Sequence, residues 1–241
     1  MRMCMAMFSI VFLCAAANTL AAPPNPPTIY EPTSDGVIVN AADVHMVSGF
    51  SDPDAGDTHQ ASDYEIWNDA LTERVGMTGQ VSFHQGSALD TKFEDGEFDG
   101  AFTMHVAMNI DDKPALYREV HRVLKPRAVF GIYDILAGPN AAGMRYPVPW
   151  ATTPDASFLA PIDAMRTMLD QAGFEIVSSE DRTGYARAFF EKMKQQAAQG
   201  GPPQLGLSLI MGADFKQKVA NMIENVGDLR CGPWEIVCRK R

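Results

Sequence analysis

The chain has 241 residues, of which 46% are hydrophobic and 21% charged, the composition of a folded globular protein rather than a disordered one. Its formal net charge of -10 at pH 7 argues against nucleic-acid binding, because the phosphate backbone is held mainly by clustered Lys and Arg. A chain of this length forms either one large domain or a small module joined to a medium one.

The first 21 residues have the layout of a secretory signal peptide: one arginine, an apolar run over 6–17, and small residues before a cleavage site after Ala21. The run is too short to span a membrane comfortably, so we expect no membrane segment in the mature form. A genuine signal predicts a secreted or periplasmic protein. If the start is misassigned, or the run is a hydrophobic first helix, the protein is cytoplasmic.

Residues 22–62 form a Pro-rich segment of β character. The stretch "APPNPPTIYEP" indicates a polyproline-type linker, and "DGVIVNAADVHMVSGF" indicates two short strands around a turn. In "SDPDAGDTH", the spacing of Asp52, Asp54 and Asp57 is compatible with calcium ligands, but the rest of an EF-hand loop is missing. A turn capped by the Asp side chains is favoured, and we predict no metal site.

From residue 63 onward the chain alternates helical and strand patterns. Apolar residues at helical spacing predict helices from about Tyr64 to Val75, and at 113–124, 161–172, 186–198 and 214–226. Runs of β-branched and aromatic residues predict strands at 81–84, 98–104, 128–136, 174–181 and 233–240. This order predicts an α/β domain over 63–241 with a mainly parallel sheet.

Two cysteines, Cys231 and Cys238, lie near the C-terminus on one predicted strand and its lead-in. Extended chain holds them roughly 23 Å apart, which is too far for a disulfide. No Cys-x-x-Cys motif or His cluster accompanies them, so a zinc site is not expected. We interpret both as small buried hydrophobic residues.

Ligands of an open α/β sheet lie at the carboxyl ends of its strands. Two such ends are visible in the sequence, at the loops Gly86–Leu89 and Thr103–His105. The small residues of the first loop let backbone N–H groups approach a flat ring, although an ordinary strand-to-loop turn explains them equally well. We expect the two loops, which follow strands predicted to be adjacent, to converge on one crevice.

From about residue 70 to the C-terminus the chain resembles class I S-adenosylmethionine-dependent methyltransferases of type 11, the branch related to ubiquinone-biosynthesis and sarcosine methylases. Three stretches in register carry the resemblance: "VSFHQGSALDTKFEDGEFDGAFTMHVAMNI", "LYREVHRVLKPRAVFGIYDIL" and "MLDQAGFEIVSSED". The resemblance implies a Rossmann-like sheet with helices on both faces. It also implies S-adenosyl-L-methionine as cofactor and a small-molecule methyl acceptor, with an amine as the expectation at family level.

The resemblance also assigns site residues. It implies that Ser87, Ala88 and Leu89 line the adenine pocket. Thr103 and Met104 then face the methionine half of the cofactor, and His105 and Asn109 border the methyl acceptor. A sulfonium methyl is already activated, so transfer mainly needs an acceptor held in line and away from water. We therefore assign no general base, and His105 is a candidate only for accepting a proton from an ammonium acceptor.

The sequence departs from the family pattern at two places. Family members often have an acid at the position of Ser87, and two glycines at the position of Arg127-Ala128. Three aromatic residues, Tyr133, Tyr146 and Trp150, could wall a cationic or flat substrate. Hydrophobic cover over the sheet is the favoured interpretation of the "MRYPVPW" stretch that contains two of them.

The family's glycine-rich cofactor loop is missing from the sequence, because no Gly-x-Gly occurs between residues 1 and 80. Asp52, after "ADVHMVSGF", is a candidate replacement for the acid that binds the ribose. Residues 22–62 resemble cadherin-like or fibronectin-like segments, which predicts a fusion with its seam near 57–69 and an incomplete methyltransferase sheet. Two functions follow: methyl transfer impaired by the missing loop, or a secreted non-catalytic binding or adhesion module that uses the α/β domain as a scaffold.

Overall fold

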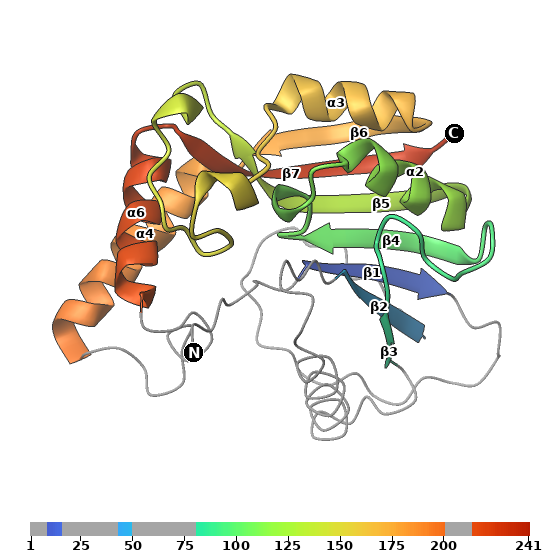
Figure 1. Ribbon diagram of the computed structural model, residues 1–241, viewed down its shortest axis with the longest axis horizontal. Helices are drawn as coiled ribbons and strands as arrows, with labels where there is room; N and C mark the ends of the chain where they lie inside the picture. The colour runs from blue at the N-terminus through green and yellow to red at the C-terminus, as the bar shows by residue number, and fades with distance from the viewer. Residues whose placement is uncertain (1–8, 16–42, 50–80, 201–213) are drawn as a thin grey trace.

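The computed structural model describes residues 9–15, 43–49, 81–200 and 214–241. Seven strands form one sheet in the order β3-β2-β1-β4-β5-β7-β6 (Figure 1). They are β1 (Ser9–Ala15), β2 (Asp43–Gly49), β3 (Val81–Gln85), β4 (Phe98–Met104), β5 (Leu124–Ala137), β6 (Phe174–Asp181) and β7 (Cys231–Lys240).

The pairing of the strands fixes where their ends lie. Strand β2 runs parallel to β3, and β4 runs parallel to β5. Strand β1 is antiparallel to both β2 and β4, and β7 is antiparallel to both β5 and β6. Strands β2, β3, β4, β5 and β6 therefore share one direction, and their carboxyl ends lie along a single edge of the sheet, called here the carboxyl edge.

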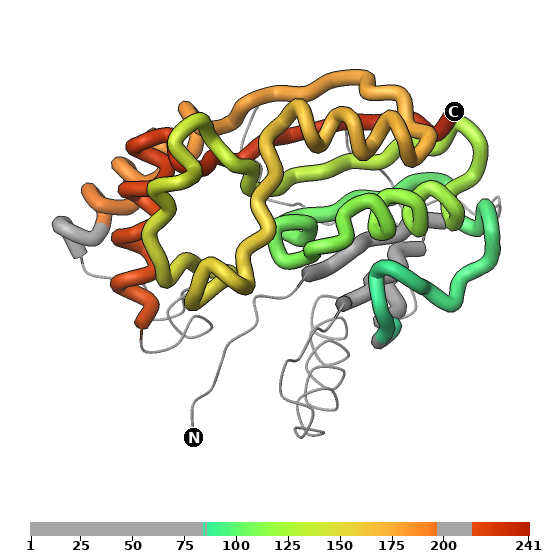
Figure 2. Tube along the Cα trace, turned by 45° about the horizontal axis from the view of Figure 1, so that its top comes forward, coloured from blue at the N-terminus to red at the C-terminus, as the bar shows by residue number. Residues whose placement is uncertain are grey.

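Four helices accompany the sheet: α2 (Lys113–Val123), α3 (Ile162–Gln171), α4 (Thr183–Gly200) and α6 (Phe215–Gly227). Helices α2 and α3 lie side by side on one face of the sheet, whereas α4 and α6 pair with each other beyond the carboxyl edge (Figures 1 and 2). Helix α2 starts after Asp112, whose carboxylate accepts a hydrogen bond from the Ala115 N–H at 2.9 Å. This cap satisfies one of the N–H groups that the first helical turn leaves unpaired.

The core lies between the sheet and helices α2 and α3. Alternate residues of β5 point inward, and Phe130 stacks near Phe174 of β6 with ring centroids 5.4 Å apart. Tyr117 of α2 covers Phe130 at 6.3 Å, and all three side chains are fully buried. A second apolar cluster, which includes Trp150 and Val226, joins the 138–160 segment to α4 and α6.

The sequence predictions for the α/β domain are confirmed at most boundaries. Strands β4 and β6 match their predicted limits, and α2, α3 and α6 match to within one or two residues, whereas α4 begins at Thr183, three residues early. The Rossmann-like α/β fold class is confirmed as well. The prediction of a mainly parallel sheet is wrong for the described strands, because β1 and β7 each run antiparallel to both of their neighbours and make the sheet mixed. The helix expected at Tyr64–Val75 lies outside the described residues.

Parts of the N-terminal predictions can be located. Residues Ser9–Ala15, inside the expected signal peptide, form β1 in the middle of the sheet, and Asp43–Gly49 forms one strand of the segment expected to be β-rich. Cleavage after Ala21 stays a prediction. The Pro-rich stretch at 22–42 and the residues Asp52, Asp54 and Asp57 lie outside the described residues.

The start of β5, directly after α2, shows how this chain replaces the family's glycine pair. Arg127 has φ +65°, a left-handed conformation that glycine adopts without strain. The β4–β5 register shifts here, from Phe98 opposite Leu124 to Gly100 opposite Val129. The backbone therefore keeps a glycine-type geometry although an arginine occupies it.

Candidate active site

The carboxyl edge has a distinct point at the end of β4. The strand order runs β3-β2-β1 on one side and β4-β5 on the other, so the order reverses between β1 and β4. Such reversal points are where open α/β sheets bind ligands. Met104 is the last residue of β4, and residues 105–110, called here the 105–110 turn, follow it and include the short helix η1 (Ala107–Asn109).

The two loops predicted to converge both leave the sheet at the carboxyl edge, since β3 and β4 run in the same direction. The strands are not neighbours as expected, because β2 and β1 lie between them. The loop after β3 nevertheless packs against β4, because the Phe93 ring meets the Phe98 ring of β4 edge-on at 4.9 Å. Ala88 and Val106 both belong to the large buried cluster of the core.

The residues predicted to line the adenine pocket lie at the start of that loop. Ala88 is buried, Leu89 is half-buried, and Ser87 is exposed. The Ser87 hydroxyl accepts a hydrogen bond from the Leu89 N–H at 3.2 Å, and the Asp90 N–H donates to the Ser87 carbonyl at 3.3 Å. These bonds define a local turn, and the contact of its residues with adenine stays a prediction.

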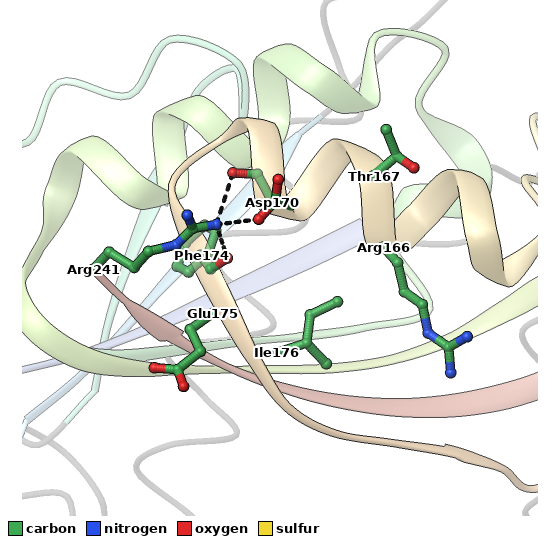
Figure 3. A pocket seen from close by; sticks show the side chains of 7 residues that line it. All are labelled: Arg166, Thr167, Asp170, Phe174, Glu175, Ile176 and Arg241. Atoms are coloured by element: carbon green, nitrogen blue, oxygen red, sulfur yellow. Dashed lines mark hydrogen bonds and ion pairs between the residues drawn. The ribbon is translucent and has the colours of Figure 1, made fainter.

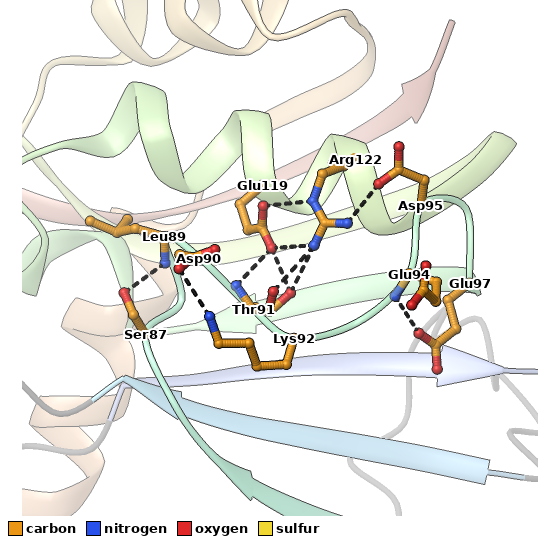
Figure 4. A network of polar contacts seen from close by, with 10 residues as sticks. All are labelled: Ser87, Leu89, Asp90, Thr91, Lys92, Glu94, Asp95, Glu97, Glu119 and Arg122. Carbon is orange, nitrogen blue, oxygen red and sulfur yellow. Dashed lines mark hydrogen bonds and ion pairs between the residues drawn. The ribbon is translucent and has the colours of Figure 1, made fainter.

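A polar network fastens this loop to helix α2 (Figure 4). One carboxylate oxygen of Glu119 accepts hydrogen bonds from the Thr91 N–H at 2.8 Å and the Thr91 hydroxyl at 2.5 Å. The Arg122 guanidinium donates to both Glu119 oxygens, at 2.7 and 2.9 Å, and pairs with Asp95 at 2.6 Å. Gly96, with φ +66°, donates its N–H to the Arg122 carbonyl at 2.9 Å.

The network includes residues of the pattern "F-x-D-G-x-F-D" at Phe93–Asp99, which lies within the first stretch that carries the family resemblance. Burial raises the pKa of Glu119, but the hydrogen bonds from Arg122 and Thr91 outweigh it and hold the pKa below its ordinary value. The aspartate of the motif, Asp95, binds Arg122, and its glycine supplies the left-handed turn. The motif therefore positions the loop that carries Ser87, Ala88 and Leu89.

Two buried polar atoms at the end of β4 have no hydrogen-bond partner in the part of the chain that the structure describes: Thr103 Oγ1 and His105 Nδ1. Thr103 is 2% exposed, and unpaired buried groups of this kind are costly unless a ligand or water satisfies them. They fit a polar ligand that reaches the carboxyl edge at this point. Met104, predicted beside Thr103, is 51% exposed, because alternate side chains of a strand point to opposite faces.

His105 is held in a specific orientation. Its backbone is left-handed, with φ +55°, and its N–H donates to the Tyr133 carbonyl at 2.8 Å. Its ring meets the Tyr133 ring edge-on at 5.5 Å. Burial lowers the pKa of His105, so the imidazole is neutral at pH 7 and Nδ1 or Nε2 can accept a proton.

Asn109, predicted to border the acceptor, braces the 105–110 turn. Its Nδ2 atom donates to the carbonyls of His105 at 3.3 Å and Val106 at 3.4 Å. Asn109 thus lies in the same turn as His105, but its contact with an acceptor stays a prediction.

Sequence reasoning missed two buried charges at this site. Asp134 of β5 is 1% exposed, and its carboxylate accepts hydrogen bonds from the N–H groups of Ala107 at 2.6 Å and Ile135 at 2.8 Å. Lys113, the first residue of α2, is 5% exposed, and its ammonium donates to the Ile110 carbonyl at 2.7 Å and to the Phe158 carbonyl. The period of two in β5 places Asp134 inward, and that signal could have identified it.

The three aromatic residues separate into two environments. Trp150 is 6% exposed, donates its indole N–H to Ser157 at 3.0 Å and belongs to the second apolar cluster. Tyr146 packs against the same cluster, which matches the favoured interpretation of this stretch as hydrophobic cover. Tyr133 alone of the three lies beside His105.

A surface hollow elsewhere does not involve these residues. It lies between α3 and the start of β6 and is lined by Arg166, Thr167, Asp170, Phe174, Glu175, Ile176 and Arg241 (Figure 3). The Arg241 guanidinium there is already used, since it binds Asp170 and donates to the Phe174 carbonyl at 2.7 Å. The hollow is therefore not the predicted crevice.

The remaining expectations concern the cysteines, metal ligands and membrane spans. Cys231 and Cys238 are free, buried thiols, and burial raises the pKa of each to about 12. No group of three or more metal-ligating side chains occurs among the residues that the structure covers. In the same residues, no helix combines the length and apolar character that crossing a membrane requires.

Comparison with known proteins finds a family model, sequence relatives and solved structures that resemble this chain. The family model described as "Methyltransferase domain" matches residues 56–132. The sterol 24-C-methyltransferase erg6 of Aspergillus fumigatus is 29% identical over 126 residues, which is 50% of this chain and 33% of the relative. The chain thus spans about a third of the length of this relative.

Two solved structures share the fold. A protein from Galdieria sulphuraria assigned as a sarcosine dimethylglycine methyltransferase has a TM-score of 0.60 and 17% identity, over 73% of this chain and 65% of that one. Geranyl diphosphate C-methyltransferase from Streptomyces coelicolor, solved with S-adenosyl-L-homocysteine, has a TM-score of 0.57 and 14% identity, over 75% and 60%. The domain match, the sequence relative and the shared fold thus all show similarity to methyltransferases, each over part of this chain.

Proposed function

We propose that the chain binds S-adenosylmethionine at the carboxyl edge and transfers its methyl group to a small-molecule acceptor. One observation carries the proposal: Thr103 Oγ1 and His105 Nδ1 are buried together at the point where the strand order reverses, without partners among the described residues. Unsatisfied polar atoms at a ligand-binding edge of the sheet are the feature expected of a site that a polar ligand completes.

The cofactor supplies an activated methyl group on a sulfonium, and the residues of this chain provide orientation. In the transfer, a lone pair of the acceptor forms the bond to the methyl carbon while the S–C bond breaks and its electrons stay on sulfur. His105, held by its Tyr133 contacts and neutral at pH 7, can take the proton that an ammonium acceptor must release before its nitrogen becomes nucleophilic.

An amine is the acceptor that this geometry favours. A neutral imidazole beside a tyrosine ring suits a cationic nitrogen, which the ring face attracts. The name of the Galdieria structure points to sarcosine and dimethylglycine, both of them amines. The names of the sterol and geranyl diphosphate enzymes specify methylation at carbon, so the relatives differ in the atom they methylate. We choose an amine because of the geometry around His105.

We further propose that cofactor affinity is reduced. The sequence has no Gly-x-Gly before residue 80, and the family match begins at residue 56, near the proposed seam. A glycine-rich loop lets backbone N–H groups approach the cofactor closely, and its loss removes those contacts.

Titration calorimetry with S-adenosyl-L-homocysteine tests the proposal, using the full chain and its Thr103→Val variant. Valine keeps the shape of threonine but lacks the hydroxyl that has no partner. We expect saturable binding by the wild type, roughly five- to tenfold weaker binding by Thr103→Val, and no loss of stability in that variant. Thr152→Val, at an exposed position, is the control. Absence of binding by the wild type would remove the activity and support the scaffold alternative.

A further inference from the structure

The two buried charges at the carboxyl edge are not explained by packing. Asp134 lies on β5 and is 1% exposed, and Lys113 lies at the start of α2 and is 5% exposed. A buried carboxylate or ammonium costs several kcal/mol unless hydrogen bonds and an opposite charge compensate it. Both side chains have such hydrogen bonds and an opposite charge, and each forms hydrogen bonds with the 105–110 turn.

The Asp134 carboxylate holds the first half of the turn. Besides the bond from Ala107 at 2.6 Å, it receives a backbone hydrogen bond from Met108. The third donor, Ile135, belongs to β5 itself, so the carboxylate links the turn directly to the strand. Without it, the N–H groups of Ala107 and Met108, two buried residues, lose their acceptor.

Lys113 holds the second half of the turn and couples it to a distant segment. Its ammonium joins the carbonyls of Ile110 and Phe158, while the Phe158 N–H donates to the Met108 carbonyl at 2.9 Å. The Phe158 ring also lies 6.0 Å from the ammonium. The turn is thus fixed at both ends by charges that attract each other through the interior.

We propose that Asp134 and Lys113 are positioning residues, which hold the 105–110 turn so that His105 and Asn109 face the methyl acceptor. The proposal rests on the proposed function for its consequence in catalysis, but the ordering of the turn is a property of the chain alone. It predicts that removing the Asp134 charge slows methyl transfer while leaving cofactor affinity unchanged, since neither side chain is among those predicted to contact the cofactor.

The ionised form of Asp134 is the one that accepts three N–H groups. Burial raises its pKa to about 7 and lowers the pKa of Lys113 to about 8, so both charges respond near neutral pH. Three titratable groups lie around them. Tyr117 of α2 has its pKa raised by burial and by the charges of Asp134 and Cys238 of β7, and the charge of Asp111 raises the pKa of Lys113. Protonation of Asp134 replaces an acceptor by a donor and weakens the hold on the turn.

Amide hydrogen exchange of the full chain tests the ordering without any ligand. In Asp134→Asn we expect exchange of the peptide over 105–110 to be at least tenfold faster, with unchanged exchange in β6 and β7. Asp163→Asn, an exposed carboxylate on α3 paired with Arg166, is the control of equal charge change.

Kinetics test the catalytic consequence. For Asp134→Asn we expect kcat to fall at least tenfold while the Kd for S-adenosyl-L-homocysteine stays within threefold of wild type. Unchanged exchange at 105–110 would overturn the proposal, and so would equal losses in cofactor and acceptor binding. If Asp134→Asn does not fold, Lys113→Met carries the same test at Ile110 and Phe158. If the wild type binds no S-adenosyl-L-homocysteine, the proposed function fails and the exchange experiment still decides the ordering.

Discussion

Replacing Glu119 by glutamine tests whether the network under the first loop sets cofactor affinity. The glutamine side chain would keep one oxygen to accept from Thr91, but its amide group would face the Arg122 guanidinium with N–H instead of oxygen. Hydrogen bonds to charged groups contribute about 1.5–3 kcal/mol each, so we expect Glu119→Gln to lower the unfolding free energy by about 1.5–3 kcal/mol. We expect most of this loss to reflect weaker attachment of the loop of residues 86–97 to α2.

If the loop must be ordered around the cofactor, the free energy lost in Glu119→Gln also weakens cofactor binding. A cost of about 1.4 kcal/mol corresponds to a tenfold change in affinity, so the Kd for S-adenosyl-L-homocysteine should rise about tenfold or more. Urea denaturation and titration calorimetry measure the two quantities. The matched control is Asp90→Asn on the same loop, whose carboxylate is 80% exposed and pairs with Lys92 at 3.2 Å. An exposed pair of this kind contributes about 0–1 kcal/mol.

The pH dependence of stability separates the charge of Glu119 from its shape. Because the folded-state pKa of Glu119 is lowered, its stabilising contribution is present above the unfolded pKa and is lost as the pH falls through the folded pKa. The stability difference between wild type and Glu119→Gln should therefore shrink below about pH 4. If the variant matches the wild type in stability and in Kd at pH 7, the network does not position the loop.

Three further predictions concern stability. Arg127→Gly should raise the unfolding free energy by about 0.5–1 kcal/mol in urea, because relief of about 1–2 kcal/mol of left-handed strain exceeds the added entropy of the unfolded chain; a loss of stability would contradict this. Gly173→Ala should cost about 2–3 kcal/mol, since φ is +96° and the new Cβ would lie 2.7 Å from His121 Nε2, and a neutral result would refute it. Because the folded pKa of Asp134 is raised to about 7, its contribution to stability falls as the pH rises from about 4 to 7, by up to about 1.4 kcal/mol per pH unit. Wild type should thus lose stability relative to Asp134→Asn over that range, and parallel pH curves would exclude the raised pKa.

The α/β domain was predictable because its local signals agree with its tertiary structure. Strand β6 is a short run of alternating residues that starts directly after Gly173, whose left-handed backbone ends the preceding helix turn. Helix α2 carries its cap, an early proline and a continuous apolar face within eleven residues. At such segments no long-range contact is needed to choose between helix and strand.

The N-terminal run shows the opposite case. An apolar stretch at 6–17 has the length of a signal-peptide core, yet Ser9–Ala15 pairs with β2 and β4 as a strand. A short apolar run is compatible with either role, and only partners far along the chain decide between them in the fold. The pairing leaves the processing of the N-terminus untested.

The charges at the site were missed for a related reason. Asp134 and Lys113 form hydrogen bonds with backbone groups of the 105–110 turn and of Phe158. Spacing in the sequence does not indicate that these groups lie together. Glu119 and Arg122 were likewise unremarkable as an i,i+3 pair on a helix, until Thr91 and Asp95 were seen to complete the network.

The direction of β1 bears on how the cofactor is held. The strand beside β4 pairs Ile10 with Met104 and Cys14 with Gly100, so it begins at the carboxyl edge and ends at the opposite one. A glycine-rich loop following a parallel first strand would face the site, but the end of β1 at Ala15 does not. Among the described strands on this side of the sheet, β2, β3 and β4 end at the carboxyl edge, and we expect the contacts to the cofactor there. The proposed acceptor side involves β4, β5 and α2, all of them described, and we expect weakened cofactor binding to limit activity before the methyl-transfer step does.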